Sequence, residues 1–164
     1  MERLLNKEDY EYNFELLKPK QFEIWAKVDS MGRNIVYWDN EYKISIDSFQ
    51  KPSLVNLYYN SNGRDIKVGE LICIDKYFIS KNNHTPYKYL SMKYVKVDTK
   101  HKGRGLSYRM VNSLLSVLNE EIKGIITNFD QRDKNSSVVK MFHNLGAFRN
   151  EFGYLEIQNP KRNE

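Results

Sequence analysis

Cysteine and histidine are scarce in this sequence, and their scarcity excludes two kinds of site. Cys73 is the only cysteine among the 164 residues, and it lies inside the apolar run 71–74. An internal disulfide is therefore excluded, and so is a cluster of metal-binding thiols. The three histidines are scattered along the chain, and no nearby carboxylates complete a zinc-binding pattern. We expect no metal site.

Long apolar runs are also absent from the sequence. The first nine residues lack the apolar core of a signal peptide. Nowhere does the sequence reach the run of about 18 apolar residues that a membrane-spanning helix requires. Because a lone cysteine also fits a reducing compartment, we expect a cytoplasmic protein that does not enter the membrane.

Dense blocks of one charge sign are missing, although basic residues outnumber acidic ones. Lys and Arg number 26 against 21 Asp and Glu, which gives a net charge of +5. A positive excess favours polyanionic partners such as a phosphorylated small molecule, nucleic acid or an acidic protein face. The excess is modest and forms no Lys/Arg block of the kind that marks nucleic-acid-binding arms, so a merely solvated basic surface explains it at least as well.

Strand patterns dominate the chain as far as residue 97. Short runs rich in Tyr, Ile, Val, Phe and Trp alternate with turn residues, and the Gly and Asn of these turns tolerate positive φ, so the runs predict antiparallel hairpins. The composition, 40% hydrophobic and 13% aromatic, fits one globular domain, 1–164. Residues 9–17 could form a short helix. The predicted strands are 22–28, 34–38, 42–46, 54–59, 67–77 and 89–97.

Helical patterns follow in the second half of the chain, where the apolar period changes from two residues to about 3.6. We expect Gly124 to end the first helix, and a short buried strand to follow at 125–127. A second helix is expected to open at Asn135 and to stop at Gly146, before a last strand at 154–157. The apolar stripe of the first helix consists of Leu106, Met110, Val111, Leu114, Leu115 and Leu118.

The most informative segment is the basic, glycine-bearing loop between the strand that ends at Val97 and the first helix. Gly103 and Gly105 allow the backbone to approach a ligand closely, and the unpaired amide groups and dipole of a helix N-terminus attract anions. Ser107 is small enough not to block that approach. A strand, a glycine loop and a helix N-terminus in this order favour the binding of a pyrophosphate. The patterns of Walker loops and dinucleotide-binding folds do not occur in the sequence.

Two motifs in this half of the chain resemble those of one protein family. The segment from Lys102 to Ser107 resembles the Gln/Arg-x-x-Gly-x-Gly/Ala signature of the GCN5-related N-acetyltransferase (GNAT) family. Residues 135–148 are similar to the family's Asn-x-x-Ala-x-x-x-Tyr-x-x-x-Gly-Phe pattern. The resemblance covers 89–157 and implies an α/β (α+β) fold, in which a mixed, mostly antiparallel sheet is flanked by helices, here with extra N-terminal strands.

The resemblance also implies which residues bind acetyl-CoA, the acyl donor of the family. Main-chain groups of Val95 and Val97 would pair with the pantetheine arm where two strands splay apart. Asn135 would contact the pantetheine end, and Phe142 would lie beside the sulfur. The loop would bind the pyrophosphate through backbone amides, with its two cations facing phosphate; its residues are Lys102, Gly103, Arg104, Gly105, Leu106 and Ser107.

Phe142 is the departure from the family pattern that bears most on chemistry. Family members commonly carry Tyr at this position, and its hydroxyl can protonate the departing thiolate, which Phe cannot do. Lys102 and Ser107 depart conservatively, since they keep a cation and a small side chain, although Lys lacks the bidentate fork of Arg. Phe142 leaves two interpretations open, an enzyme with another proton donor and a module that binds coenzyme A without catalysis.

Direct acetyl transfer needs a base that removes a proton from the acceptor ammonium. Glu70, which follows Gly69 in a predicted strand, is the candidate base, directly or through water; alternatively it is an exposed carboxylate paired with a neighbouring lysine. We interpret His101 as a solvent-facing loop residue. Tyr94 and Tyr154 could supply a hydroxyl near the sulfur, although a strand tyrosine more often serves packing.

The sequence thus predicts an acetyl-CoA dependent N-acetyltransferase that acts by direct attack in a ternary complex. Its acyl-CoA binding unit spans 89–157, and the part without a family match, 1–88, faces the acceptor. The acceptor is an unidentified amine of a protein, peptide, aminoacyl-tRNA or small molecule, and the basic surface favours an acidic protein or RNA partner over polyamines. A nucleic-acid-binding sheet with an incidental glycine turn is a further alternative.

Overall fold

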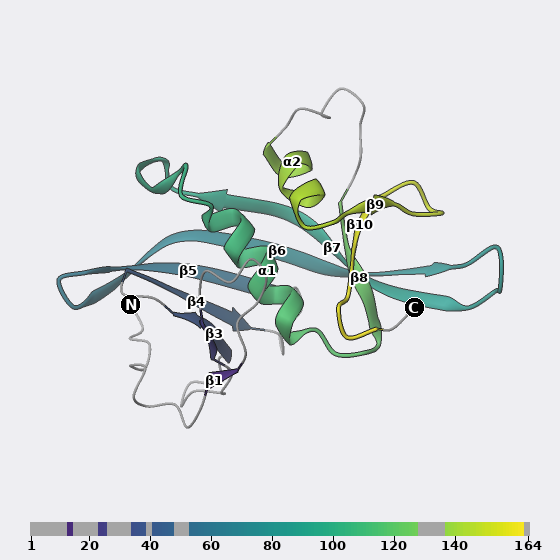
Figure 1. The fold of residues 1–164 in the computed structure, drawn as a ribbon, viewed down its shortest axis with the longest axis horizontal. Coiled ribbons are helices and arrows are strands. Elements are labelled where there is room, and N and C mark those ends of the chain that lie inside the picture. Colours follow the sequence, from purple (N-terminus) through teal and green to yellow (C-terminus); the bar gives the residue numbers. More distant parts are fainter. Residues whose placement is uncertain are drawn as a thin grey trace.

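Ten strands form a single sheet in the computed structural model, which describes residues 13–14, 23–25, 34–38, 41–47, 53–127 and 137–162 (Figure 1). The sheet order is β1-β2-β3-β4-β5-β6-β7-β8-β10-β9. Among the described strands only the pairing of β7 with β8 is parallel. The architecture confirms the mixed, mostly antiparallel sheet predicted from the sequence. The strands are β1 (Asn13–Phe14), β2 (Glu23–Trp25), β3 (Asn34–Trp38), β4 (Tyr42–Asp47), β5 (Ser53–Ser61), β6 (Arg64–Ile79), β7 (Pro86–Val97), β8 (Ile122–Thr127), β9 (Phe148–Arg149) and β10 (Leu155–Gln158).

The strands from β4 to β7 form consecutive hairpins, as their alternating sequence predicts. At the turn between β5 and β6, Asn62 and Gly63 take φ values of 51° and 81°. Two successive residues with positive φ give a turn whose twist matches that of the flanking strands, and Asn-Gly is the pair that adopts it most readily. The turn residues therefore fix the register of this hairpin.

The two neighbours of β7 leave it at different points. β8 pairs with β7 only from Lys88 to Ser91, whereas β6 stays paired with β7 as far as Val97. The register between β6 and β7 shifts at Lys93, which has no partner on β6 and forms a bulge. Since this bulge lies where β8 departs, the second half of β7 has one edge that no described strand covers.

Two helices in the described part of the chain pack into the hydrophobic core. Helix α1 (Leu106–Val117) crosses the sheet and packs on β3 to β7 (Figure 1). Its predicted apolar stripe is confirmed, because all six of its residues are buried. Helix α2 (Ser137–Asn144) joins the same core through Val139, Met141 and Phe142.

The predicted end of the first helix is wrong. α1 stops at Val117, because Leu118 already has an extended backbone with ψ of 137°. Gly124, expected to end the helix, lies inside β8 and faces β10. A Cβ at Gly124 would stand 2.4 Å from the carbonyl oxygen of Ile157, so glycine is needed here for close packing of two strands.

Other sequence-based boundaries have mixed outcomes. The end of the second helix is confirmed, since Gly146 (φ 82°) and Ala147 donate their N–H groups to the last turn of α2. The short helix expected at 9–17 is wrong at residues 13–14, which pair with β2 as a strand. Asn135, the predicted start of the second helix, lies outside the described residues. No helix in the described part of the chain is long and apolar enough to cross a membrane.

Candidate functional site

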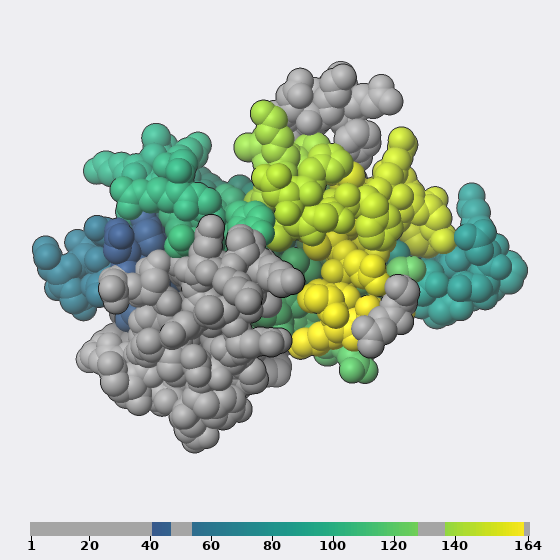
Figure 2. All heavy atoms as spheres, viewed as in Figure 1, coloured from purple at the N-terminus to yellow at the C-terminus, as the bar shows by residue number. Residues whose placement is uncertain are grey.

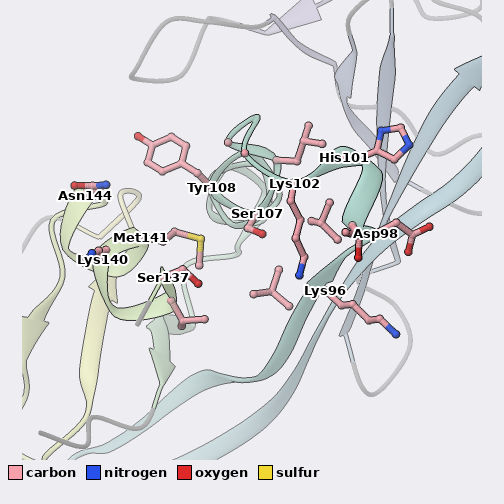
Figure 3. Close-up of a pocket in the computed structure, with 17 residues that line it drawn as sticks. Lys96, Asp98, His101, Lys102, Ser107, Tyr108, Ser137, Lys140, Met141 and Asn144 are labelled. Atoms are coloured by element: carbon pink, nitrogen blue, oxygen red, sulfur yellow. The ribbon is translucent and has the colours of Figure 1, made fainter. Parts of the chain in front are cut away.

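A cleft of about 770 Å³ opens beside the second half of β7. Three parts of the chain line it: the end of β7 with the loop after it, the first turn of α1, and one side of α2 (Figure 3). The space-filling view shows this loop and α2 on the same face of the molecule (Figure 2). The charged residues that contribute to the lining are Lys96, Asp98, Lys102 and Lys140, and three of these four are basic.

The loop turns into α1 through two glycines with left-handed backbone. Gly103 has φ of 82°, and Gly105, the N-cap of α1, has φ of 72°, which L-residues rarely adopt. A Cβ added at either glycine would meet no atom within 4 Å, so the space in front of the loop is open. Gly105 provides no side-chain cap, and the first turn of α1 contains no acidic residue. Backbone N–H groups and the positive end of the helix dipole therefore face the cleft without a competing carboxylate from this turn, and Asp98 is the one acidic residue in the lining.

The open edge of β7 presents main-chain groups to the same cleft. Asp98 donates its N–H to the carbonyl of Val68 at 2.7 Å, and the carbonyl oxygen of Lys96 lies against Gly69, so both residues face β6. Because main-chain groups alternate along a strand, those of Val95 and Val97 point to the opposite edge, from which β8 has departed. An extended ligand can pair with this edge as an added strand would.

Lys102 is the cation that extends into the cleft. Figure 3 shows its side chain between β7 and α2, with Ser107 and Met141 facing the same space, whereas the side chain of Lys96 points away. Sequence reasoning missed Tyr108, which lines the cleft from the first turn of α1. Burial raises the pKa of its hydroxyl, so Tyr108 stays protonated at neutral pH. The sequence signal that could have identified Tyr108 was its position directly after Ser107, at the start of the predicted helix.

Arg104 and His101 lie differently from what the sequence led us to expect. Arg104 donates from Nη1 to the hydroxyl of Tyr42 at 2.8 Å. The glycines on either side of Arg104 line the cleft, but Arg104 does not. His101 is half-buried, with Nδ1 2.9 Å from the same hydroxyl and its ring 4.8 Å from that of Tyr59. His101 is therefore only partly solvent-facing, because two tyrosines of β4 and β5 pack against it, and it also lines the cleft.

Glu70 lies on β6 on the sheet face opposite α1, since its neighbours Gly69 and Leu71 are buried on the other face. Its carboxylate accepts hydrogen bonds from Lys67 Nζ at 2.6 Å and from the Tyr94 hydroxyl. The bond to Lys67, followed by that to Tyr94, lowers the pKa of Glu70, so it is ionised at neutral pH. The hydrogen bond to Glu70 in turn raises the pKa of Tyr94. The exposed pairing with lysine that the sequence left as an alternative is thus present.

Phe142 does not reach the cleft. Its side chain is fully buried, and the residues of α2 that line the cleft are Ser137, Val138, Lys140, Met141 and Asn144. Asn135 lies outside the described residues. The structure thus brings together the predicted loop and strand groups, and it places Phe142 in the core behind them.

No protein-family model and no curated protein matches this sequence. The fold is similar to solved structures at low identity. One is AtaT complexed with acetyl-methionyl-tRNAfMet, at 17% identity over 65% of this chain and 71% of that chain, with a TM-score of 0.47. Another is the KacTA–DNA complex, at 12% identity over 74% and 70%, with a TM-score of 0.48. A third is the NatC complex bound to Gag peptide and CoA, at 16% identity over 63% and 67%, with a TM-score of 0.45. The mostly antiparallel sheet, the divergence of β7 from β8 and the glycine loop that leads into α1 are features that the resemblance of the sequence motifs implied.

Proposed function

We propose that this protein is an acyl-CoA dependent N-acyltransferase, which moves an acetyl group from acetyl-CoA to an amine by direct attack in a ternary complex. One observation supports this most: the open edge of β7, the glycine loop and the N-terminus of α1 converge on one cleft. An edge that pairs with amides, followed by a site for a diphosphate, matches the order of groups in acetyl-CoA. The volume of the cleft lies within the range of roughly 300 to 1,000 Å³ that is usual for ligand sites.

Each part of the cleft has a defined task in this proposal. The main chain of Val95 and Val97 pairs with the pantetheine amides, in the way that a peptide extends a sheet edge. The backbone amides from Gly103 to Ser107 receive the diphosphate, and Lys102 adds a point charge. When bound, acetyl-CoA supplies a thioester whose acetyl carbon bonds to the amine nitrogen while its bond to sulfur breaks, and the proton that the amine loses balances the one that the thiol gains.

Glu70, which lies on β6 outside the residues that line the cleft, is the candidate proton acceptor of this proposal. It is ionised at neutral pH, but its lowered pKa makes it too weak a base to deprotonate an ammonium. In the proposal it accepts the proton that a neutral amine loses as its nitrogen bonds to the acetyl carbon, directly or through water. We expect Glu70→Gln to lower kcat by about 10- to 100-fold without changing acetyl-CoA affinity. Asp75→Asn removes another carboxylate of β6, one paired with Lys88 at 3.7 Å, and serves as the matched control. Equal kcat in the two variants would assign Glu70 to its surface pairing alone.

Transfer itself is tested by incubation with acetyl-CoA and a panel of amines. The panel contains peptides with free N-termini, an aminoacyl-tRNA and a polyamine, because the net charge of +5 favours acidic or RNA-linked acceptors over polycations. Mass spectrometry should show the gain of one acetyl group on an acceptor, matched by free thiol. Thiol release without an acetylated acceptor would point to hydrolysis and contradict the proposed acceptor chemistry.

A second candidate function is binding of acyl-CoA without catalysis. The observation that favours it is Phe142, which offers no hydroxyl and is fully buried. This alternative predicts that acetyl-CoA raises the unfolding temperature of the protein, as any ligand of the native state does. It also predicts that no amine of the panel releases thiol. The same panel therefore separates the two candidates.

A further inference from the structure

The loop that lines the cleft has a second contact surface on its other side. Between Gly103 and Gly105, both in left-handed conformation, the Arg104 side chain turns to the sheet and reaches Tyr42 at 2.8 Å. The same guanidinium lies 3.6 Å from Glu41 Oε2. Arg104 is thus tied to the start of β4, although the two positions are about 60 residues apart in sequence.

The Tyr42 hydroxyl has two hydrogen-bond partners in the loop. A guanidinium can only donate, so the Tyr42 oxygen accepts from Arg104, and Nδ1 of His101 lies 2.9 Å from the same oxygen, where its tautomer decides which of the two donates. Tyr42 is itself buried, and its ring packs against that of Tyr59, 5.4 Å away. The tyrosine is therefore a rigid anchor in the core, and it holds the loop at two points, Arg104 and His101.

We propose that Arg104 is a positioning residue, which fixes the shape of the cofactor loop through Tyr42 and His101, and that Lys102 is the cation that meets the diphosphate. This inference rests on the proposed function and replaces the expectation that both cations face phosphate. Glycine loses more backbone freedom on ordering than any other residue, so a loop with two glycines needs an external tie if its amides are to be arranged before the ligand arrives. The tie from Arg104 to Tyr42 meets this need.

The test measures acetyl-CoA affinity across a KCl series for single variants. Lys102→Ala should flatten the salt dependence, because it removes a charge that contacts phosphate. Arg104→Ala and Tyr42→Phe should each weaken binding by about 5- to 10-fold and keep the wild-type salt dependence, since both remove the same charge-assisted hydrogen bond, which Arg104 donates to the sheet and not to the diphosphate. The double variant of Arg104→Ala with Tyr42→Phe should bind acetyl-CoA no worse than whichever single variant binds it more weakly, because the two substitutions remove the same interaction.

Two control variants test whether the loss of affinity is specific to these positions. Lys100→Ala removes a charge from the same loop at a position outside the cleft lining, and Tyr77→Phe removes a hydroxyl on the distant β6–β7 hairpin; both should bind as wild type does. Thermal unfolding identifies variants that fail to fold. The inference would be overturned if Arg104→Ala flattened the salt dependence as Lys102→Ala does and if its loss of affinity added to that of Tyr42→Phe. That result would leave the proposed function standing. Wild-type protein that binds no acetyl-CoA would contradict the proposed function and this inference with it.

Discussion

At the scale of single residues, the structure changes what Phe142 means. The family pattern puts a tyrosine hydroxyl at this place, but here the ring belongs to the core of α2 and is fully buried. A proton donor for the thiolate is therefore not restored by adding an oxygen to this ring. Tyr108 is a tyrosine that does line the cleft, and burial raises the pKa of its hydroxyl.

Phe142→Tyr is therefore expected to cost stability and to give no gain in turnover. Its hydroxyl would enter an apolar core without an arranged partner, which costs about 1 to 3 kcal/mol. Phe148→Tyr, on an exposed ring, is the control and should leave the free energy of unfolding unchanged. Urea unfolding and steady-state kinetics measure both variants. A rise in kcat with unchanged stability would show that the ring reaches the reacting sulfur.

The pH dependence of stability tests the pairing of Glu70 with Lys67 and Tyr94. Because the pKa of Glu70 is lowered below its ordinary value of 4.5, the pairing stabilises the fold above that value and is lost as the pH falls through the lowered pKa. Glu70→Gln should be less stable than wild type at pH 7 by at most about 1 kcal/mol, as for exposed pairs. The difference should vanish in acid, whereas Glu120→Gln should show none at either pH. A constant difference across the series would mean that the carboxylate charge does not matter.

At the scale of elements, the sequence predicted those helices and strands that depend on local apolar patterns. The strands at 34–38, 42–46 and 54–59 and the stripe of α1 follow from alternation and helical period, and the structure confirms them with small shifts at the ends. The glycine loop was recognisable because its residues are contiguous. Gly124 was misread because a glycine after a helix and a glycine required by a neighbouring strand look alike in sequence.

Gly124→Ala tests this explanation of Gly124. The added methyl would overlap the Ile157 carbonyl of β10, so β8 and β10 would have to move apart, at a cost of about 1 to 3 kcal/mol. Gly63→Ala meets no atom within 4 Å and should cost only about 1 kcal/mol for its positive φ. Urea unfolding compares the two. Equal losses would show that the sheet accommodates the methyl without strain.

Contacts between segments that are distant in the chain could not be predicted from the sequence. Nothing local to Tyr42 signals that its hydroxyl lies between Arg104 and His101, because the contact depends on how the β4–β5 hairpin registers against the loop after β7. The same holds for the burial of Phe142, which depends on the rotation of α2 about its axis. Helical period fixes which residues share a face, and packing alone decides which face meets the cleft.

At the scale of the whole molecule, the fold concentrates binding groups at the place where the sheet opens. The parallel pairing of β7 with β8 ends after four residue pairs, and α1 connects the two strands so that its N-terminus lies at this opening. The buried core includes none of the loop residues 99–105. This is why one loop substitution should abolish binding without unfolding the protein.

The most direct test of this account is calorimetric titration of acetyl-CoA into wild type, Gly105→Glu and Gly63→Glu. Both glycines have positive φ and open space around them, so glutamate imposes similar backbone strain at each, but only position 105 places an anion at the diphosphate site. The account predicts that wild type and Gly63→Glu bind alike and that Gly105→Glu, still folded, does not bind. Wild-type affinity in a folded Gly105→Glu variant, or equal losses in both variants, would contradict it.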